Sequence, residues 1–224
     1  MNKFINQVEP AVSTVGGFPV LYYGELPKDR CVYISSSSSM DSETEKYLYA
    51  SSLEAALMGY EVIYIPTLKK DDPIKNGVFD GKGTLHAVIP FGLYRSNKRD
   101  ISQNIIHGGS VISESLEDSF SLERLERAKL IASAFADSIV VGERLWLKRI
   151  GEYIEQSLDN GKDVAVLKSV LGSHYLNDLV LNGAPAITTF SDFIINPPLF
   201  IYPHENGRYF QKGFCFDIIS YGDM

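Results

Sequence analysis

The sequence predicts an α/β protein in which a mostly parallel sheet has helices on both faces and is followed by a C-terminal β-hairpin. Two observations predict this fold class. Short runs rich in β-branched and aromatic residues alternate with longer amphipathic stretches along most of the 224 residues. Each short run is also apolar at nearly every position, which is typical of strands buried on both faces of a parallel sheet. A hydrophobic content of 45% is enough for one sizeable core.

The first strand, helix and strand are expected within Val32–Ile65. Val32–Ile34 is a run of strand formers that leads into five consecutive serines, Ser35–Ser39. The helix that follows has an N-cap, an acidic first turn, an apolar face and a terminal glycine: Asp41, Glu43, Glu45, Ala50, Leu53, Leu57 and Gly59. Glu61–Ile65 then supplies the second strand.

Later segments continue the alternation of strands and helices. Further strands are predicted at residues 85–90, 110–113, 138–141, 164–167 and 186–188, and further helices at 100–106, 121–135, 146–158 and 175–181. Residues 66–83 are expected to form a long loop, with Asp71 and Asp72 as solvated charges. Glu123 and Arg127 are spaced for an ion pair across one helical turn.

The pattern divides the chain into three parts. Residues 1–30 are expected to be an irregular segment that packs on the edge of the sheet, and residues 31–194 are expected to form the α/β domain. Residues 195–224 contain two aromatic runs separated by Asn206-Gly207, which is a strong hairpin signal. We expect this hairpin to extend the sheet or to cap the core.

Composition and motifs argue against several classes of function. A net charge of −7 argues against binding nucleic acid or an acidic membrane over the whole surface. The sequence has no charged-then-apolar leader and no apolar run long enough for a bilayer, so we expect a cytoplasmic protein without membrane contact. Cys31 and Cys215 stand alone and are expected to be buried, and the four histidines lie in separate segments. Glycine-rich nucleotide loops and nucleophile elbows are absent from the sequence, so we expect no cofactor, no metal and no catalysis.

The serine run is the first candidate for ligand binding. Small hydroxyl residues before a helix N-terminus let backbone N–H groups approach an anion, and phosphate is the anion that such loops typically bind. Ser36, Ser37 and Ser38 would line such a loop. A plain flexible turn is the alternative interpretation of the same residues.

Positive charge is the second candidate feature. Ligands of open parallel sheets lie outside the carboxyl ends of the strands. On that rule the loops at this edge carry nine cationic residues: Lys69, Lys70, Arg95, Lys98, Arg99, Arg144, Lys148, Arg149 and Lys168. Their concentration in an acidic protein indicates a phosphate-bearing ligand, either a nucleic-acid strand or a nucleotide. Phe91 and Tyr94 could stack on bases or pack in the core, and carboxylates at the same edge leave ordinary loop charge as the alternative.

Six segments, taken in order, resemble motifs of one protein family: Phe18–Gly24, Gly92–Asn97, Gly108–Glu114, Arg127–Ser133, Gly161–Val164 and Ser173–Ala184. The family is that of DNA-processing protein A (DprA, or Smf), and the resemblance runs from about Phe18 to Ile194. It implies an extended Rossmann-like fold that binds single-stranded DNA, helps to load the RecA recombinase during natural transformation, and forms a homodimer. The chain departs from the family in its first loop, where Ser36 and Ser38 replace a glycine–x–arginine turn.

The leading hypothesis is a recombination mediator that binds single-stranded DNA without catalysis. Its phosphate contacts are expected from the serine run and the cationic loops, namely Ser36, Ser37, Ser38, Lys69, Lys70, Arg95, Lys98, Arg99, Lys148, Arg149 and Lys168. Arg127 and Lys129 are expected to order the neighbouring helix. Two alternatives stay open: a nucleotide-binding or nucleotide-hydrolysing Rossmann protein of the same superfamily that uses the serine loop, and a degenerate relative kept for protein contacts alone.

Overall fold

A nine-stranded sheet forms the centre of the computed structural model, which describes residues 9–67, 71–96, 98–144, 151–195, 201–203 and 209–211. Its strands are β1 (Ala11–Val15), β2 (Phe18–Gly24), β3 (Cys31–Ser36), β4 (Glu61–Tyr64), β5 (Leu85–Val88), β6 (Ser110–Ser113), β7 (Ser138–Gly142), β8 (Asp163–Leu167) and β9 (Ala186–Ile187). They lie in the order β1-β2-β6-β5-β4-β3-β7-β8-β9. The strands from β6 to β9 pair in parallel, whereas β1 and β2 are antiparallel, so the predicted fold class is confirmed.

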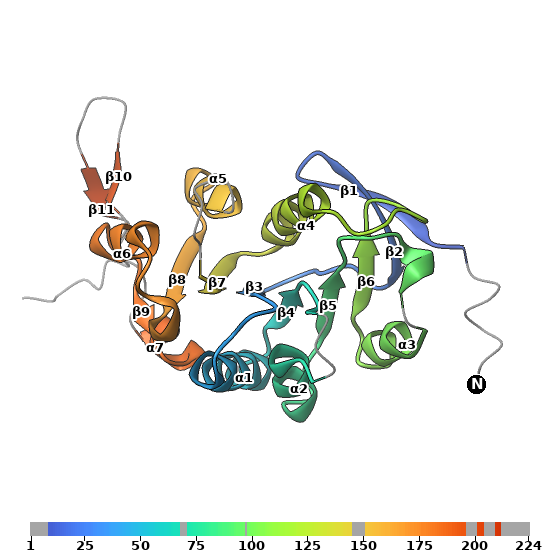
Figure 1. Cartoon of the computed structure of the whole chain (residues 1–224), viewed down its shortest axis with the longest axis horizontal. Helices are drawn as coiled ribbons and strands as arrows, with labels where there is room; N and C mark the ends of the chain where they lie inside the picture. The colour runs from blue at the N-terminus through green and yellow to red at the C-terminus, as the bar shows by residue number, and fades with distance from the viewer. Residues whose placement is uncertain are drawn as a thin grey trace, which may run out of the picture.

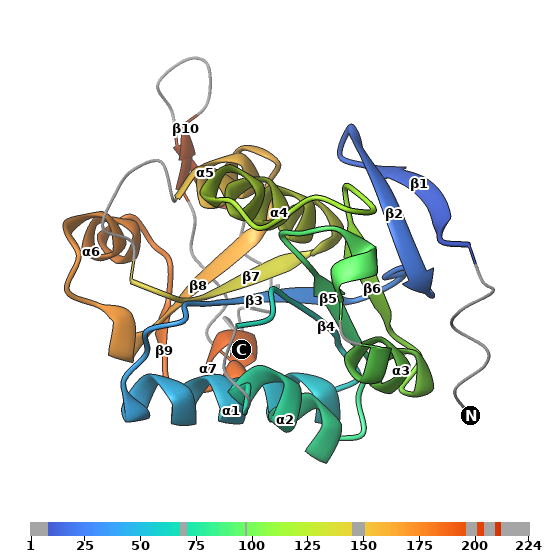
Figure 2. The same cartoon turned by 45° about the vertical axis from the view of Figure 1, so that its right-hand side comes forward.

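Helices cover both faces of this sheet (Figures 1 and 2). They are α1 (Ser42–Leu57), α2 (Pro73–Asp80), α3 (Lys98–Ile106), α4 (Leu122–Phe135), α5 (Glu152–Asp159), α6 (His174–Leu181) and α7 (Phe190–Ile195), with single 3-10 turns at η1 (Leu93–Arg95) and η3 (Lys168–Val170). Figure 2 shows α1, α2, α3 and α7 below the sheet and α4 and α5 above it. The parallel strands are buried at nearly every position, as the continuous apolar runs predicted. In the described part of the chain, no helix is both long enough and apolar enough to cross a bilayer.

The N-terminal segment is a regular hairpin, so the expectation of irregular structure is wrong for Ala11–Gly24. Gly16 and Gly17 form the two-residue turn between β1 and β2, with φ of 53° and 84°. Both angles lie in the left-handed region that glycine adopts without strain, and a turn of this kind matches the twist of a hairpin. β2 pairs with β6, so the hairpin adds two antiparallel strands to one end of the main sheet.

The predicted loop over residues 66–83 contains helix α2, and this is a second correction. Asp72 is the N-cap: its carboxylate accepts hydrogen bonds from the amides of Ile74 and Thr67 and from the Thr67 hydroxyl. Asp72 is 5% exposed and is therefore a buried capping residue, not the solvated charge expected from the sequence. Gly77 allows α2 to pack closely on α1, because a Cβ at that position would overlap Ser52 and the Tyr49 carbonyl.

The C-terminal hairpin is present but separate from the main sheet. Strands β10 (Ile201–Pro203) and β11 (Tyr209–Gln211) pair antiparallel and form their own two-stranded sheet. The hairpin prediction is confirmed for these strands. Of the two placements expected for the hairpin, extension of the main sheet is wrong. The predicted turn at Asn206-Gly207 and the second cysteine, Cys215, lie outside the described residues.

Candidate nucleic-acid interface

The chain reverses its direction across the sheet at β3. From β3 the chain adds β4, β5 and β6 on one side, and α4 then returns it to β7 on the other side of β3. In open α/β sheets such a reversal creates a crevice outside the carboxyl ends of the two central strands. The serine run begins in the last two residues of β3, where Ser36 pairs with Gly142 at the end of β7. The predicted serine loop therefore lies at the topological switch point.

The three candidate serines differ in what they offer a ligand. The hydroxyl of Ser36 is buried without a hydrogen-bond partner among the described residues. Ser37 donates its hydroxyl to the carbonyl of Ser39 at 3.0 Å, and Ser38 is exposed. Of these three serines, only Ser38 is exposed and has a hydroxyl without a hydrogen bond among the described residues.

A carboxylate of the protein itself occupies the N-terminus of α1. Asp41 is the N-cap, as predicted, and its Oδ1 accepts a hydrogen bond from the Thr44 amide at 2.8 Å. Its Oδ2 accepts a hydrogen bond from Arg144 at 3.0 Å. The bond from the Thr44 amide is the main cause that lowers the pKa of Asp41. A phosphate at this helix end would have to bind beside Asp41 or displace it.

The crevice itself is narrow. It forms an open cleft of about 80 Å³ that is lined by Ser37, Ser39, Met40, Asp41, Thr44, Gly142, Arg144 and Val170. Sites that enclose a small-molecule ligand typically measure roughly 300 to 1,000 Å³. The cleft is therefore too small to enclose a nucleotide in this conformation, whereas a strand that crosses its rim needs no enclosing pocket.

A buried polar network of side chains from α4, α5 and the end of β7 contacts the start of the serine run. Lys129 Nζ on α4 donates to Glu143 Oε2 at 2.6 Å, and the two side chains are only 6% and 5% exposed. The Tyr153 hydroxyl lies 3.0 Å from both Glu143 Oε1 and the hydroxyl of Ser35. Ser35 also accepts a hydrogen bond from the Gly142 amide, which ties β3 to β7. Burial, followed by the charge of Glu143, raises the pKa of Tyr153 well above its ordinary value, so the phenol stays neutral and available as a donor.

Sequence reasoning did not identify this network. Lys129 was expected only to order a helix, and the carboxylates at this edge, of which Glu143 is one, were expected to be ordinary loop charges. A signal was present, because Lys129 lies four residues after Leu125 and three before Ala132, on the apolar face of α4. A lysine on that face needs a buried ion-pair partner, but the sequence around Lys129 does not identify Glu143 as that partner.

The structure brings some of the predicted cations together. Arg95 on η1 and Arg99 on α3 are exposed and follow β5, and the backbone of Lys98 begins α3 beside them. Lys168 on η3 is exposed and follows β8. The two groups lie on opposite sides of the serine loop, because the strands that they follow, β5 and β8, are four strand spacings or about 19 Å apart. The remaining predicted cations, Lys69, Lys70, Lys148 and Arg149, lie outside the described residues, as does the side chain of Lys98.

Other arginines at this edge are neutralised by carboxylates. Three ion pairs join Arg144 to Asp41, Arg124 to Asp118, and Arg127 to Glu114. The last is bidentate and replaces the expected pairing of Arg127 with Glu123. Arg95 differs from these three, since its Nε donates to the backbone carbonyl of Glu117 at 2.6 Å. The edge therefore carries both signs of charge, and Arg95, Arg99 and Lys168 are exposed there at η1, α3 and η3.

Comparison with solved structures assigns the fold. DNA processing protein A from Streptococcus pneumoniae superposes with a TM-score of 0.64 and 18% identity, covering 79% of this chain and 65% of that chain. The same protein from Helicobacter pylori, described for its single-stranded DNA binding mode, gives a TM-score of 0.64 and 15% identity over 84% of this chain and 95% of that one. A molybdenum cofactor binding protein from Rippkaea orientalis gives a TM-score of 0.52 and 11% identity, covering 77% and 94%. The chain thus has the Rossmann-like fold of DNA processing protein A, and the fold implied by the family resemblance is confirmed.

Comparison of sequences does not extend this assignment. No protein-family model matches the chain. A 102-residue stretch, 45% of the chain, is 32% identical to the E3 ubiquitin-protein ligase UBR2 of Saccharomyces cerevisiae. The matched stretch spans about 5% of the length of that ligase, so it carries no inference about function.

Proposed function

We propose that this protein binds single-stranded DNA along the carboxyl edge of its parallel sheet. The observation that carries the proposal is the arrangement of exposed cations at Arg95, Arg99 and Lys168 on both sides of the serine loop at the switch point. Its shared fold with the Helicobacter pylori protein, for which a single-stranded DNA binding mode is described, supports the same ligand.

In this proposal the DNA backbone lies across the rim of the sheet. Arg95, Lys98 and Arg99 neutralise phosphates on one side, and Lys168 does so on the other. Between them, Ser36, Ser37 and Ser38 supply backbone N–H donors. Lys69 and Lys70 follow β4 in the sequence, Lys148 and Arg149 follow β7, and these four cations add further charge. A net charge of −7 repels DNA from the rest of the surface, so binding depends on these few contacts and is sensitive to salt.

Fluorescence anisotropy with labelled oligo-dT at a series of salt concentrations tests the proposal. The logarithm of the binding constant should fall linearly with the logarithm of salt, with a slope of about −0.7 for each phosphate neutralised. Reversing charge with Arg95→Glu and Lys98→Glu should weaken binding and reduce that slope. Lys82→Glu is the matched control, because Lys82 is exposed just before β5 at the opposite edge of the sheet. Binding that is undetectable, or equally weakened by the control, would refute the proposal.

The resemblance to DNA processing protein A extends the proposal to a biological role. We place the protein among recombination mediators that deliver single-stranded DNA to RecA during DNA uptake, that act as homodimers and that carry out no catalysis. Co-sedimentation of this protein with RecA on oligo-dT tests the partner, and light scattering after gel filtration tests the dimer. If the protein binds oligo-dT but does not co-sediment with RecA, DNA binding would stand and the proposed RecA partnership would be refuted.

Nucleotide binding in the cleft at the switch point is the second candidate function. The cleft and its arginine, Arg144, favour it, since a single phosphate could replace Asp41 as the partner of that arginine. Its volume of about 80 Å³ and the capping carboxylate disfavour it. A thermal-shift screen of nucleoside mono-, di- and triphosphates against short oligonucleotides decides between the candidates. Stabilisation by nucleotides but not by oligo-dT would select this second function.

A further inference from the structure

Two loops at the β5–β6 end of the candidate edge are joined into one platform, which we define as residues 91–95 and 114–120. The amides of Gly92, Leu93 and Tyr94 donate to the carbonyls of Asp118, Ser115 and Leu116 at 2.8, 3.0 and 2.9 Å. Arg95 adds a side-chain bond from its Nε to the Glu117 carbonyl. Successive backbone bonds of this kind hold the 3-10 turn η1 flat against the loop that follows β6.

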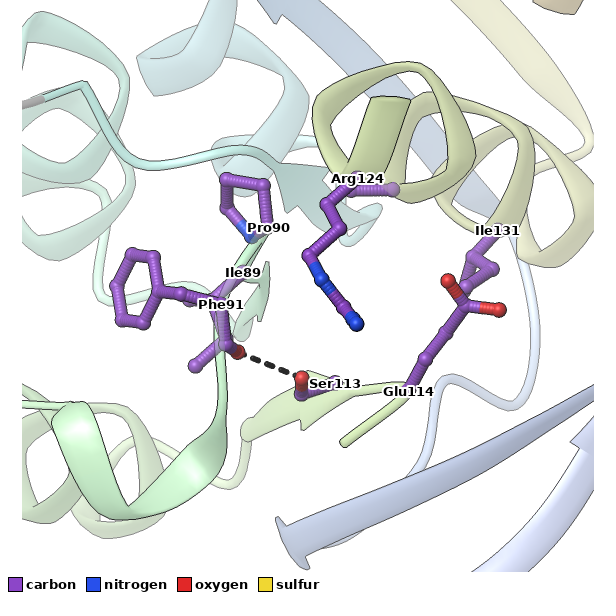
Figure 3. A pocket seen from close by; sticks show the side chains of 8 residues that line it. Ile89, Pro90, Phe91, Ser113, Glu114, Arg124 and Ile131 are labelled. Carbon is purple, nitrogen blue, oxygen red and sulfur yellow. Dashed lines mark hydrogen bonds between the residues drawn. The ribbon is translucent and has the colours of Figure 1, made fainter. Parts of the chain in front are cut away.

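Close packing beneath the platform leaves it little freedom to move. A Cβ at Gly92 would overlap the backbone of Leu116 and Glu117, so only glycine permits this contact. Ser113 donates its hydroxyl to the Phe91 carbonyl at 2.6 Å, and this bond is drawn in Figure 3. Arg124 extends from α4 into the space between the ends of β5 and β6, as Figure 3 shows, and the cavity left there is about 10 Å³. Such a volume holds about one water molecule.

The platform presents two exposed aromatic rings, Tyr94 and Phe120. Tyr94 is the one followed directly by a cation, Arg95, which has no carboxylate partner among the described residues. Tyr94 is 59% exposed, whereas Phe91 is half-buried and packs against the core. The sequence left both aromatics as candidates for base stacking, and the structure separates them. Arg95, the next residue, is exposed, and among the described residues only its Nε is engaged. Its two terminal amino groups are therefore available to a phosphate.

We infer that Tyr94 stacks on a base of the bound strand while Arg95 holds an adjacent phosphate. The inference rests on the proposed function and adds a base-contacting residue to a site otherwise defined by charge. A ring on an anchored turn loses little entropy on binding, because the backbone bonds of η1 already fix its position. Stacking uses the face of any base, so the contact strengthens binding without selecting a sequence.

Two oligomers of equal length, oligo-dT and an abasic strand with the same phosphates, separate stacking from charge. Tyr94→Ala should weaken binding to oligo-dT by about 5- to 150-fold, the range measured for loss of one stacked base, and leave binding to the abasic strand unchanged. Tyr94→Phe keeps the ring and should bind like wild type. Arg95→Gln removes charge and should weaken binding to both oligomers.

The outcomes distinguish failure of the inference from failure of the proposed function. If wild type binds neither oligomer, the proposed function fails and the inference falls with it. If wild type binds oligo-dT and Tyr94→Ala binds it equally well, the inference alone is overturned. Equal losses on both oligomers would also overturn it, because they would indicate a disturbed platform; far-UV circular dichroism and the melting temperature of each variant check that the fold is intact.

Discussion

Lys129→Met tests the buried network that supports the serine loop. The substitution keeps the length of the side chain and removes the ammonium group that lies 2.6 Å from Glu143 Oε2. Both partners are almost completely buried, at 6% and 5% exposure, so water cannot replace the lost charge. Removing one member of a buried ion pair typically costs about 3 to 5 kcal/mol, because the other charge is left without a partner.

Urea unfolding followed by far-UV circular dichroism measures this cost. For a chain of this size, a loss of about 3 to 5 kcal/mol corresponds to a fall of about 6 to 20 °C in melting temperature. The free energy of unfolding should fall with urea concentration at the same slope as in wild type, because unfolding exposes the same surface. Lys75→Met is the control: Lys75 pairs with Asp100 at 2.7 Å, but that pair is partly exposed, so the loss should stay below about 1 kcal/mol.

A double variant decides whether the cost is due to an unpaired charge. Lys129→Met combined with Glu143→Gln leaves no ion in this network and retains an amide that can bond to Tyr153. Its stability should return to within about 2 kcal/mol of wild type, above that of Lys129→Met alone. A loss below about 1 kcal/mol in Lys129→Met, or a double variant less stable than the single one, would refute the reasoning.

Three further predictions concern other parts of the chain. The pKa of Glu61 is lowered, chiefly by its hydrogen bond with His86. The ionised carboxylate therefore stabilises the fold above its ordinary pKa of 4.5, and this stabilisation is lost as the pH falls through the lower pKa of the folded state. In urea unfolding below about pH 5, Glu61→Gln should lose less stability with falling pH than wild type does. Burial raises the pKa of Cys31 to about 12, so in a Cys215→Ser background the thiol should react with a disulfide reagent at pH 8.5 only after unfolding; rapid reaction of the native protein would contradict this. Gly92→Ala should displace η1 and weaken binding to oligo-dT, and an unchanged affinity would show that the platform is not needed.

The parallel strands were predictable because burial on both faces leaves a continuous apolar signal. The N-terminal hairpin was missed because β1 is largely exposed and β2 is largely half-buried, so neither strand has that signal. Gly16-Gly17 between two strand-forming runs was the feature of the sequence that indicated a hairpin turn. Helix α2 was missed for a different reason: with Asn76 and Gly77 in its middle it has weak helix propensity, and its packing on α1 stabilises it.

The same contact explains the wrong face assigned to α1. Leu57 was expected on the apolar face and is 68% exposed, whereas Ser51 and Ser52 are fully buried. Small side chains on α1 allow close approach of α2, so size and not polarity decides which face is covered. The sequence of one helix does not determine how closely a second helix will pack against it. The face of such a helix therefore could not be derived from its own sequence.

The charge of the candidate site shows the limit of sequence reasoning most clearly. The rule that places loops at the carboxyl edge correctly gathered Arg95, Arg99 and Lys168 there, because it depends only on topology. It could not predict which cations remain unpaired, since Arg144 meets Asp41 across 103 residues of sequence. The pair of Arg144 with Asp41 neutralises an arginine at the centre of the edge, whereas Arg95 on η1 and Lys168 on η3 are exposed on either side of it. A strand attracted by phosphate contacts alone would therefore be held at two places on either side of the crevice, and a stacking contact at the platform would fix its position at one of them.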